Sequence, residues 1–138
     1  MKIMALDYGT KRVGIALSDD MRMLAKPLPF ISAEPENKLY EALRALVLQQ
    51  EVSDIIIGLP KNMDGTLGES AQKAKAFADK VKSYTGLPVK LIDERLTTVQ
   101  ATRQLREAGH KAKDQRAKID SVSASILLQG YLDSMSLL

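Results

Sequence analysis

The first eighteen residues constrain the fold more than any other stretch of the chain. The apolar residues 3–6 lead directly into the carboxylate of Asp7, and residues 8–11, Tyr-Gly-Thr-Lys, have the composition of a tight turn. Residues 13–18 then alternate between bulky and small side chains, which is typical of a strand that lets a neighbour pack closely on one face. The segment therefore predicts two antiparallel strands, the first of them buried and ending in an acid.

Asp7 is the residue of this hairpin that most needs a chemical explanation. A carboxylate at the mouth of an apolar strand is costly to desolvate unless a positive group lies beside it, and a divalent cation with oxygen ligands would meet that need. The alternative is that Asp7 only caps the turn. The hairpin by itself does not distinguish these two roles.

The rest of the chain alternates between strand-like and helix-like patterns. A third extended segment, residues 23–31, contains Pro27 and Pro29, which suit an edge strand because proline has no N–H to donate. Further apolar runs predict strands, and apolar residues at helical spacing predict helices. The expected strands are residues 54–60 and 87–95, and the expected helices are residues 38–50, 68–84 with a stop at Gly86, 97–108 and 116–134.

This order of elements predicts an α/β fold. Its five-stranded mixed sheet combines an antiparallel meander with two parallel strands reached by right-handed crossovers, and helices flank the sheet. We expect residues 1–138 to form a single domain, because the chain has no linker, repeat or low-complexity segment.

Composition excludes several kinds of chemistry. No run approaches the ~20 apolar residues of a membrane span, and the amino terminus has no signal-peptide pattern, so we expect a cytoplasmic protein without membrane contact. The chain has no cysteine, which removes disulfides, thiolate metal sites and cysteine nucleophiles. His110 is the single histidine, and a lone surface histidine is its simplest interpretation, although it could also assist a leaving group. Any metal site must therefore be built from carboxylates.

Positive charge gathers in residues 103–118, where six basic and two acidic residues give a net charge of +4. Such a segment fits a polyanionic partner such as nucleic acid. An ordinary solvated helix end and loop would have the same composition.

Acidic residues recur at three comparable places: Asp7, the pair Asp93-Glu94 and Asp120 on the last predicted helix. Ligands of open α/β sheets bind beyond the carboxyl ends of the strands, so acids that end two strands are candidates for one site. Asp120 joins them if the last helix packs across the sheet. Three carboxylates in one cleft would repel each other unless Mg²⁺ or Mn²⁺ lay between them, and such ions catalyse phosphodiester hydrolysis.

Four motifs spread over nearly the whole chain resemble the YqgF (RuvX) family. They are Asp7-Tyr-Gly-Thr-Lys-Arg-Val-Gly-Ile-Ala16, Gly58-Leu-Pro60 with Asn62, Asp64 and Gly65, Asp93-Glu-Arg-Leu-Thr-Thr98, and Lys118-Ile-Asp-Ser121. The resemblance implies a ribonuclease H-like fold related to the resolvase RuvC. It also implies a nuclease that processes the 5′ end of pre-16S ribosomal RNA, with Holliday-junction resolution as the alternative activity. The family's catalytic and metal-binding acids correspond to Asp7, Glu94 and Asp120.

Glu94 is favoured over Asp93 because adjacent strand residues face opposite ways, although a bulge would allow Asp93 to be the ligand. Basic and polar residues near the predicted site are candidates for contact with nucleic acid. Alternatively, the basic residues at the tip of the hairpin serve only solubility, and the polar loop after residue 60 is an ordinary turn. These candidates are Lys11, Arg12, Lys61, Asn62, Lys113, Arg116 and Lys118. We expect structured RNA as the partner, with ribosomal precursor particles or a DNA junction as further possibilities.

Two competing classes share the expected fold. ATP-binding proteins related to actin, Hsp70 and the sugar kinases begin with a similar Asp-x-Gly-Thr turn, but they hold nucleotide between two such domains and 138 residues supply one. A non-catalytic nucleic-acid-binding module is the other class. The three acids disfavour it, and the aromatic content of 4% offers no evident platform for stacking bases.

Overall fold

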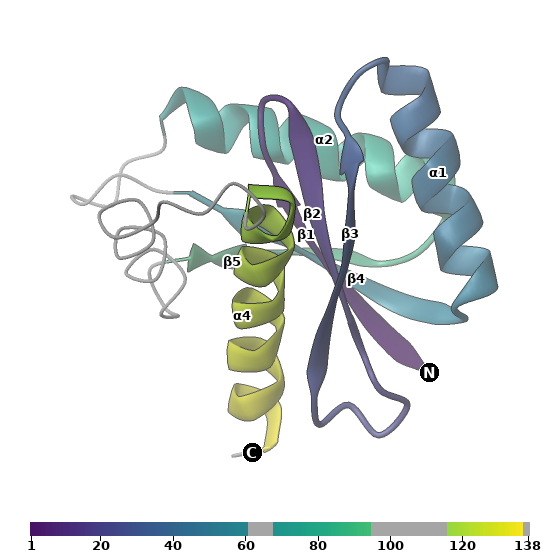
Figure 1. Cartoon of the computed structure of the whole chain (residues 1–138), viewed down its shortest axis with the longest axis vertical. Helices are drawn as coiled ribbons and strands as arrows, with labels where there is room; N and C mark the ends of the chain where they lie inside the picture. Colours follow the sequence, from purple (N-terminus) through teal and green to yellow (C-terminus); the bar gives the residue numbers. More distant parts are fainter. Residues whose placement is uncertain (61–67, 95–115, 137–138) are drawn as a thin grey trace.

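A five-stranded mixed sheet forms the centre of the molecule in the computed structural model, which describes residues 1–60, 68–94 and 116–136 (Figure 1). The strand order is β3-β2-β1-β4-β5. Neighbours are antiparallel from β1 to β2 and from β2 to β3, and parallel from β1 to β4 and from β4 to β5. The strands are β1 (Lys2–Tyr8), β2 (Arg12–Ser18), β3 (Ala25–Ser32), β4 (Val52–Leu59) and β5 (Val89–Asp93). The predicted meander with two added parallel strands is confirmed.

A tight turn joins β1 to β2. The backbone N–H of Gly9 donates to the carbonyl oxygen of Arg12 at 3.0 Å. A Cβ atom at position 9 would lie 2.7 Å from that same oxygen, closer than real Cβ atoms come, so the turn needs a residue without a side chain. The turn thereby sets the register in which Asp7 pairs with Gly14.

The edge strand is β3, as its prolines predicted. Pro27 and Pro29 are both exposed, and the pairing of β2 with β3 shifts register between Val13 and Ile15.

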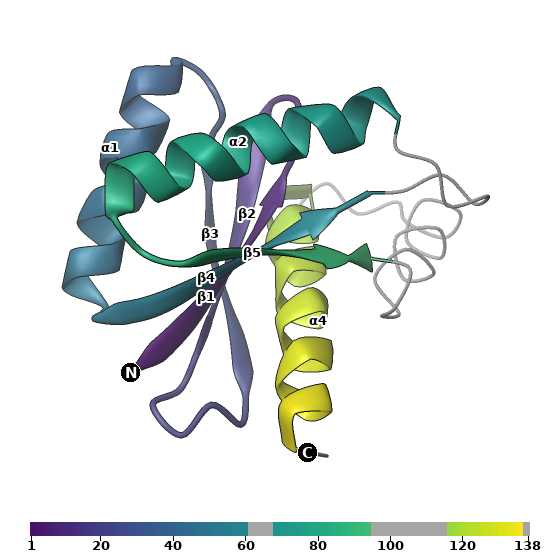
Figure 2. The same ribbon diagram turned by 180° about the vertical axis from the view of Figure 1, so that it is seen from behind.

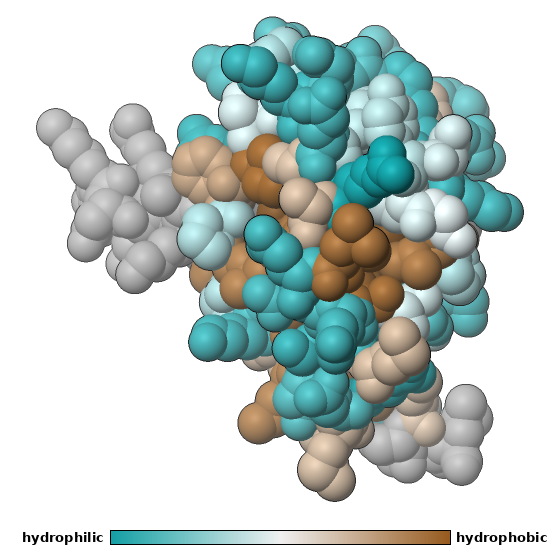
Figure 3. Space-filling model, turned by 90° about the vertical axis from the view of Figure 1, so that its right-hand side faces the viewer, coloured by the Kyte–Doolittle hydropathy of each residue, from teal (hydrophilic) through white to brown (hydrophobic). Residues whose placement is uncertain are grey.

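Figure 3 shows apolar surface among hydrophilic residues on the side that carries α1 in Figure 1. Exposed apolar side chains of the described residues include Met21 and Leu24 in the connection from β2 to β3.

Helices cover both faces of the sheet (Figures 1 and 2). The helices α1 (Glu36–Gln49) and α2 (Glu69–Thr85) pack on one face, and α4 (Arg116–Ser136) packs on the other. Each face has its own apolar core, because successive residues of a strand point to opposite sides. Leu6 and Ile57 belong to the larger core beneath α1 and α2, whereas Ala5 and Ile56 belong to the core beneath α4.

The helix ends follow the expected signals. Gly86 ends α2 in the left-handed conformation, with φ of 71°, and its N–H donates to the carbonyl oxygen of Lys82 at 2.8 Å. The strand predicted over residues 87–95 begins two residues later and ends two residues earlier than expected. The helix predicted over residues 97–108 lies outside the described residues. None of the described helices is both long enough and apolar enough to cross a membrane.

Candidate active site

Asp7 lies on the face of the sheet that α4 covers. Ile3 and Ala5 of β1 pack in the core beneath α4, and Asp7 continues this alternating series. Its exposed fraction is only 8%, so the carboxylate has lost most of its contact with water. Asp7 pairs with Gly14 of β2, which has no side chain to cover it from that strand. This position, near the carboxyl end of an interior strand, is where open α/β sheets bind ligands.

Glu94 directly follows β5 and is 5% exposed. Its side chain lies against Gly58 of β4: a Cβ atom built on Gly58 would be 2.5 Å from Oε1 of Glu94 and 3.1 Å from its Cγ and Cδ atoms. Ile56, two residues before Gly58, packs beneath α4, so the space above Gly58 opens on that same face. Glu94 and Asp7 therefore occupy one face of the sheet.

The strand β4 separates these two carboxylates in the sheet, and Gly58 is the residue of β4 between them. Leu6 pairs with Ile57 on one side of β4, and Gly58 pairs with Ile92 on the other. Continuing the first register by one residue brings Asp7 beside Gly58. The side chain of Glu94 thus extends from β5 over β4, in the direction of β1.

Asp93, the alternative considered for the site, belongs to the other face by register. Val89 and Leu91 of β5 pack against the core beneath α1 and α2, and Asp93 continues their series. Ile92 packs against the core beneath α4. The strand thus directs the two adjacent acids to opposite sides of the sheet.

The amino-terminal part of α4 is fastened to β2 close to Asp7. The backbone N–H of Ile15 donates to the hydroxyl oxygen of Ser121 across 3.4 Å, and both residues are buried. Ile15 follows Gly14, the partner of Asp7 in the sheet. Asp120 precedes Ser121 in α4, but its side chain lies outside the part of the chain that the structure describes.

Asp7 and Glu94 are the described residues that could hold a metal ion at this site. Within residues 1–60, 68–94 and 116–136, no group of three or more potential metal-ligating side chains gathers in one place. The two buried carboxylates offer oxygen ligands only, which suits a hard cation such as Mg²⁺ or Mn²⁺ and not a soft one.

Few of the residues predicted to contact nucleic acid can be followed in space. Lys11 is exposed in the turn from β1 to β2. Arg12 is half-buried, with its guanidinium 4.9 Å from the centre of the Phe30 ring. Lys61, Asn62 and Lys113 lie outside the described residues, as does most of the basic segment of residues 103–118. The backbone of Arg116 and Lys118 begins α4, but their side chains are outside the described part.

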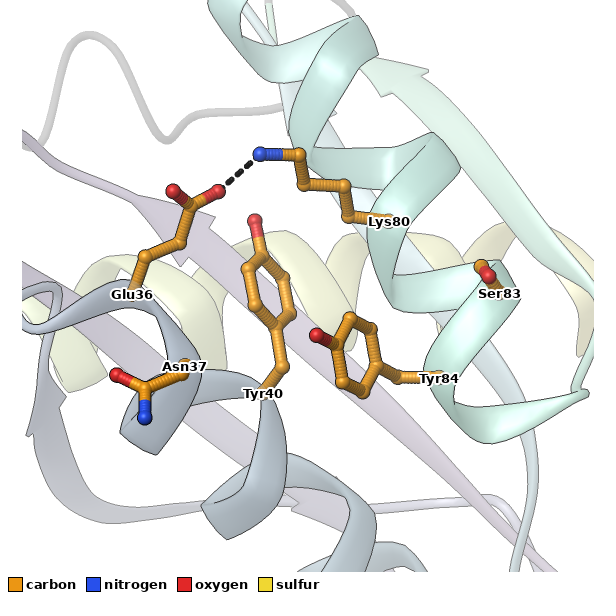
Figure 4. Close-up of a pocket in the computed structure, with 6 residues that line it drawn as sticks. All are labelled: Glu36, Asn37, Tyr40, Lys80, Ser83 and Tyr84. Atoms are coloured by element: carbon orange, nitrogen blue, oxygen red, sulfur yellow. Dashed lines mark hydrogen bonds and ion pairs between the residues drawn. The ribbon is translucent and has the colours of Figure 1, made fainter.

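A separate pocket of about 270 Å³ lies between α1 and α2, away from the face that carries Asp7 and Glu94 (Figure 4). Tyr40 and Tyr84 stack there with ring centres 4.9 Å apart, and Lys80 pairs with Glu36. Burial, reinforced by the negative charge of Glu36, raises the pKa of the Tyr40 hydroxyl above its ordinary value of 10.0. The stacked rings and the ion pair each connect a residue of α1 to a residue of α2, so we attribute to them a structural role in joining the two helices.

The sequence prediction did not include Gly58 among the residues that shape the site. Its signal was visible, because a glycine interrupts an otherwise continuous apolar strand, and such glycines mark a bulge or the close approach of another group. The sequence could not indicate which group approaches. The contact with Glu94 depends on the pairing of β4 with β5.

The mixed sheet with helices on both faces defines a ribonuclease H-like fold, as predicted. The solved structure of Thermus thermophilus RuvC in complex with a Holliday junction substrate has the same fold: the TM-score is 0.62 at 12% identity, covering 99% of this chain and 96% of that one. The chain belongs to the RuvX family, described as Holliday junction resolvase, which matches residues 1–134.

Curated relatives are similar over nearly their whole length. A protein of Halothermothrix orenii named "Putative pre-16S rRNA nuclease" is 45% identical over 133 residues, which cover 96% of this chain and 95% of the relative. A protein of Lachnospira eligens with the same name is 42% identical over 137 residues, covering 97% and 98%. The family description and these names both denote enzymes that cut nucleic acid strands, and the chain is a nuclease of this family.

Proposed function

We propose that the chain hydrolyses phosphodiester bonds at the 5′ end of pre-16S ribosomal RNA, with Asp7, Glu94 and Asp120 as the catalytic residues. The single observation that carries this proposal is the burial of two carboxylates on one face of the sheet, near the carboxyl ends of β1 and β5. Two carboxylates on one face offer oxygen ligands to a hard divalent cation, and such a cation would offset the repulsion between their negative charges. The names of the relatives supply the RNA substrate.

In this proposal the three acids hold Mg²⁺ or Mn²⁺. Asp7 and Glu94 offer buried oxygen ligands, and Ser121 fixes the turn of α4 that carries Asp120. When bound, such an ion stabilises charge on the phosphate and favours ionisation of water. Water adds to phosphorus, the bond from phosphorus to the 3′ oxygen breaks, and that oxygen takes up a proton. The products are a 5′-phosphate and a 3′-hydroxyl.

The proposed RNA partner would reach the site from the β1–β2 turn. Lys11 is exposed there, and the alternation of β2 assigns Arg12 to the α4 face, the same face as Asp7. Basic side chains in this position attract phosphates and orient the strand without reading its sequence. Lys61, Asn62, Lys113, Arg116 and Lys118 would extend this surface. The enzyme would act in the cytoplasm on ribosomal precursor particles.

The test compares two neighbouring acids of the same strand end. Glu94→Gln removes the ligand charge at nearly constant shape, and Asp93→Asn makes the same change on the opposite face of the sheet. We expect the cleavage rate of a pre-16S RNA fragment with Mg²⁺ or Mn²⁺ to fall at least about 100-fold in Glu94→Gln. Asp93→Asn serves as the matched control and should cleave at close to the normal rate. Full activity of Glu94→Gln would refute the assignment.

A second candidate function is the resolution of Holliday junctions, which is the description of the family. Assays of the same variants on a four-way DNA junction separate the two. Cleavage of the junction with no cleavage of the RNA would favour this alternative and overturn the RNA proposal. Binding of both substrates without cleavage under any divalent cation would instead indicate a non-catalytic binding module.

A further inference from the structure

The backbone conformation of Gly58 does not explain why this position is a glycine. It is a buried residue inside β4, a strand that pairs on both sides. Gly86 is the one glycine of the described residues with a positive φ. The backbone of Gly58 therefore has a conformation that other residues adopt readily. Glycine within a strand carries an entropic penalty and gives up the packing of a side chain. The requirement for glycine must therefore come from what lies against it.

What lies against it is the side chain of Glu94. A Cβ atom on Gly58 would meet Oε1 at 2.5 Å and the Cδ and Cγ atoms at 3.1 Å. The first distance is shorter than real Cβ contacts, and the other two involve the stem of the side chain as well as its tip. The volume that a side chain at position 58 would fill is thus taken by Glu94, which is itself 5% exposed.

The register explains what this contact achieves. Gly58 pairs with Ile92 of β5 on one side, and on the other it continues the pairing of Leu6 with Ile57 toward Asp7. A carboxylate that starts beyond the end of β5 must pass over β4 to approach an acid on β1. At the residue where it passes, any side chain would stand in its path.

We infer that Gly58 is a positioning residue, whose missing side chain lets the carboxylate of Glu94 extend across β4 toward Asp7. This inference rests on the proposed function, in which both acids hold a divalent cation. Gly58 touches neither the substrate nor the cation in this scheme. It acts through Glu94 alone, and that dependence is what an experiment can isolate.

The experiment measures Mn²⁺ affinity by electron paramagnetic resonance, so that its readout does not depend on cleavage. In Gly58→Ala the new methyl group forces Glu94 aside, and we expect Mn²⁺ to bind at least about 10-fold more weakly. The matched control is Ile56→Val, which trims a buried side chain of the same strand and the same face. This control should bind Mn²⁺ normally, which separates a local effect on Glu94 from a general loosening of β4.

A double-variant cycle tests whether Gly58 acts through Glu94. Glu94→Ala should weaken Mn²⁺ binding by itself, and adding Gly58→Ala to that variant should cause no further loss. Equal losses in the two backgrounds, or normal affinity of Gly58→Ala, would overturn the inference while leaving the role of Glu94 intact. Normal affinity of Glu94→Ala would instead remove Glu94 from the proposed metal site, and the inference with it.

Discussion

The two faces of the sheet allow a matched test of whether α4 belongs to the active site. Leu128 of α4 and Leu43 of α1 are both helical leucines with exposed fractions of 0% and 1%. Leu128 packs in the core beneath α4, and Leu43 packs in the core beneath α1 and α2. Replacing either by alanine therefore makes the same chemical change on opposite sides of one sheet.

The expected loss of stability is similar for both variants. Each replacement removes three carbon atoms, worth about 2.4 kcal/mol at about 0.8 kcal/mol per carbon, and the cavity left behind raises the cost to about 3 kcal/mol. A protein of 138 residues has an unfolding free energy on the order of 10 kcal/mol, so we expect both variants to remain folded. Their activities can then be compared directly.

The two variants should differ in function. Leu128→Ala weakens the docking of α4, the helix that carries Asp120, and we expect slower RNA cleavage together with hydrogen exchange of α4 amides up to about 100-fold faster. Leu43→Ala should speed exchange in α1 and leave cleavage close to normal. The reasoning is refuted if α4 amides become unprotected in Leu128→Ala while cleavage stays normal, or if Leu43→Ala abolishes cleavage with α4 still protected.

Three further predictions concern single groups. Glu36→Gln should lower the pKa of Tyr40 toward its ordinary value of 10.0, which a titration followed by phenolate absorbance measures. Because folding raises this pKa, the neutral hydroxyl contributes to the free energy of unfolding at lower pH, and that contribution is lost only as the pH rises above about 10. The carboxylate of Asp19 accepts hydrogen bonds from backbone N–H groups, that of Leu24 foremost, and these lower its pKa below 3.8. Asp19→Ala should therefore unfold more easily than the parent at neutral pH. The difference in stability should disappear as the pH falls below the lowered pKa of the folded protein, where Asp19 is protonated. Ser121→Ala leaves a buried backbone N–H of β2 without its acceptor and should cost about 1 kcal/mol in denaturant unfolding.

Local sequence patterns determined most of the fold. The hairpin around Gly9, the edge position of a strand with Pro27 and Pro29, and the stop of α2 at Gly86 all follow from residues close together in the chain. Such features depend on backbone conformations and missing donors that a few residues fix by themselves. The sequence also identified acids at the ends of two strands, and strand alternation favoured Glu94 over its neighbour.

Tertiary structure decided how the candidate site is arranged. The approach of Glu94 to Gly58, and the bond from Ile15 to Ser121, join residues that are 36 and 106 positions apart in the chain. Neither contact has a local signature, because each depends on the register of strand pairing and on the face to which a helix docks. A shift of one residue in β4 would turn the space above Gly58 to the other side of the sheet. The local sequence therefore determines that acids end two of the strands, and only the pairing of the strands in the folded sheet determines which of these acids share a face.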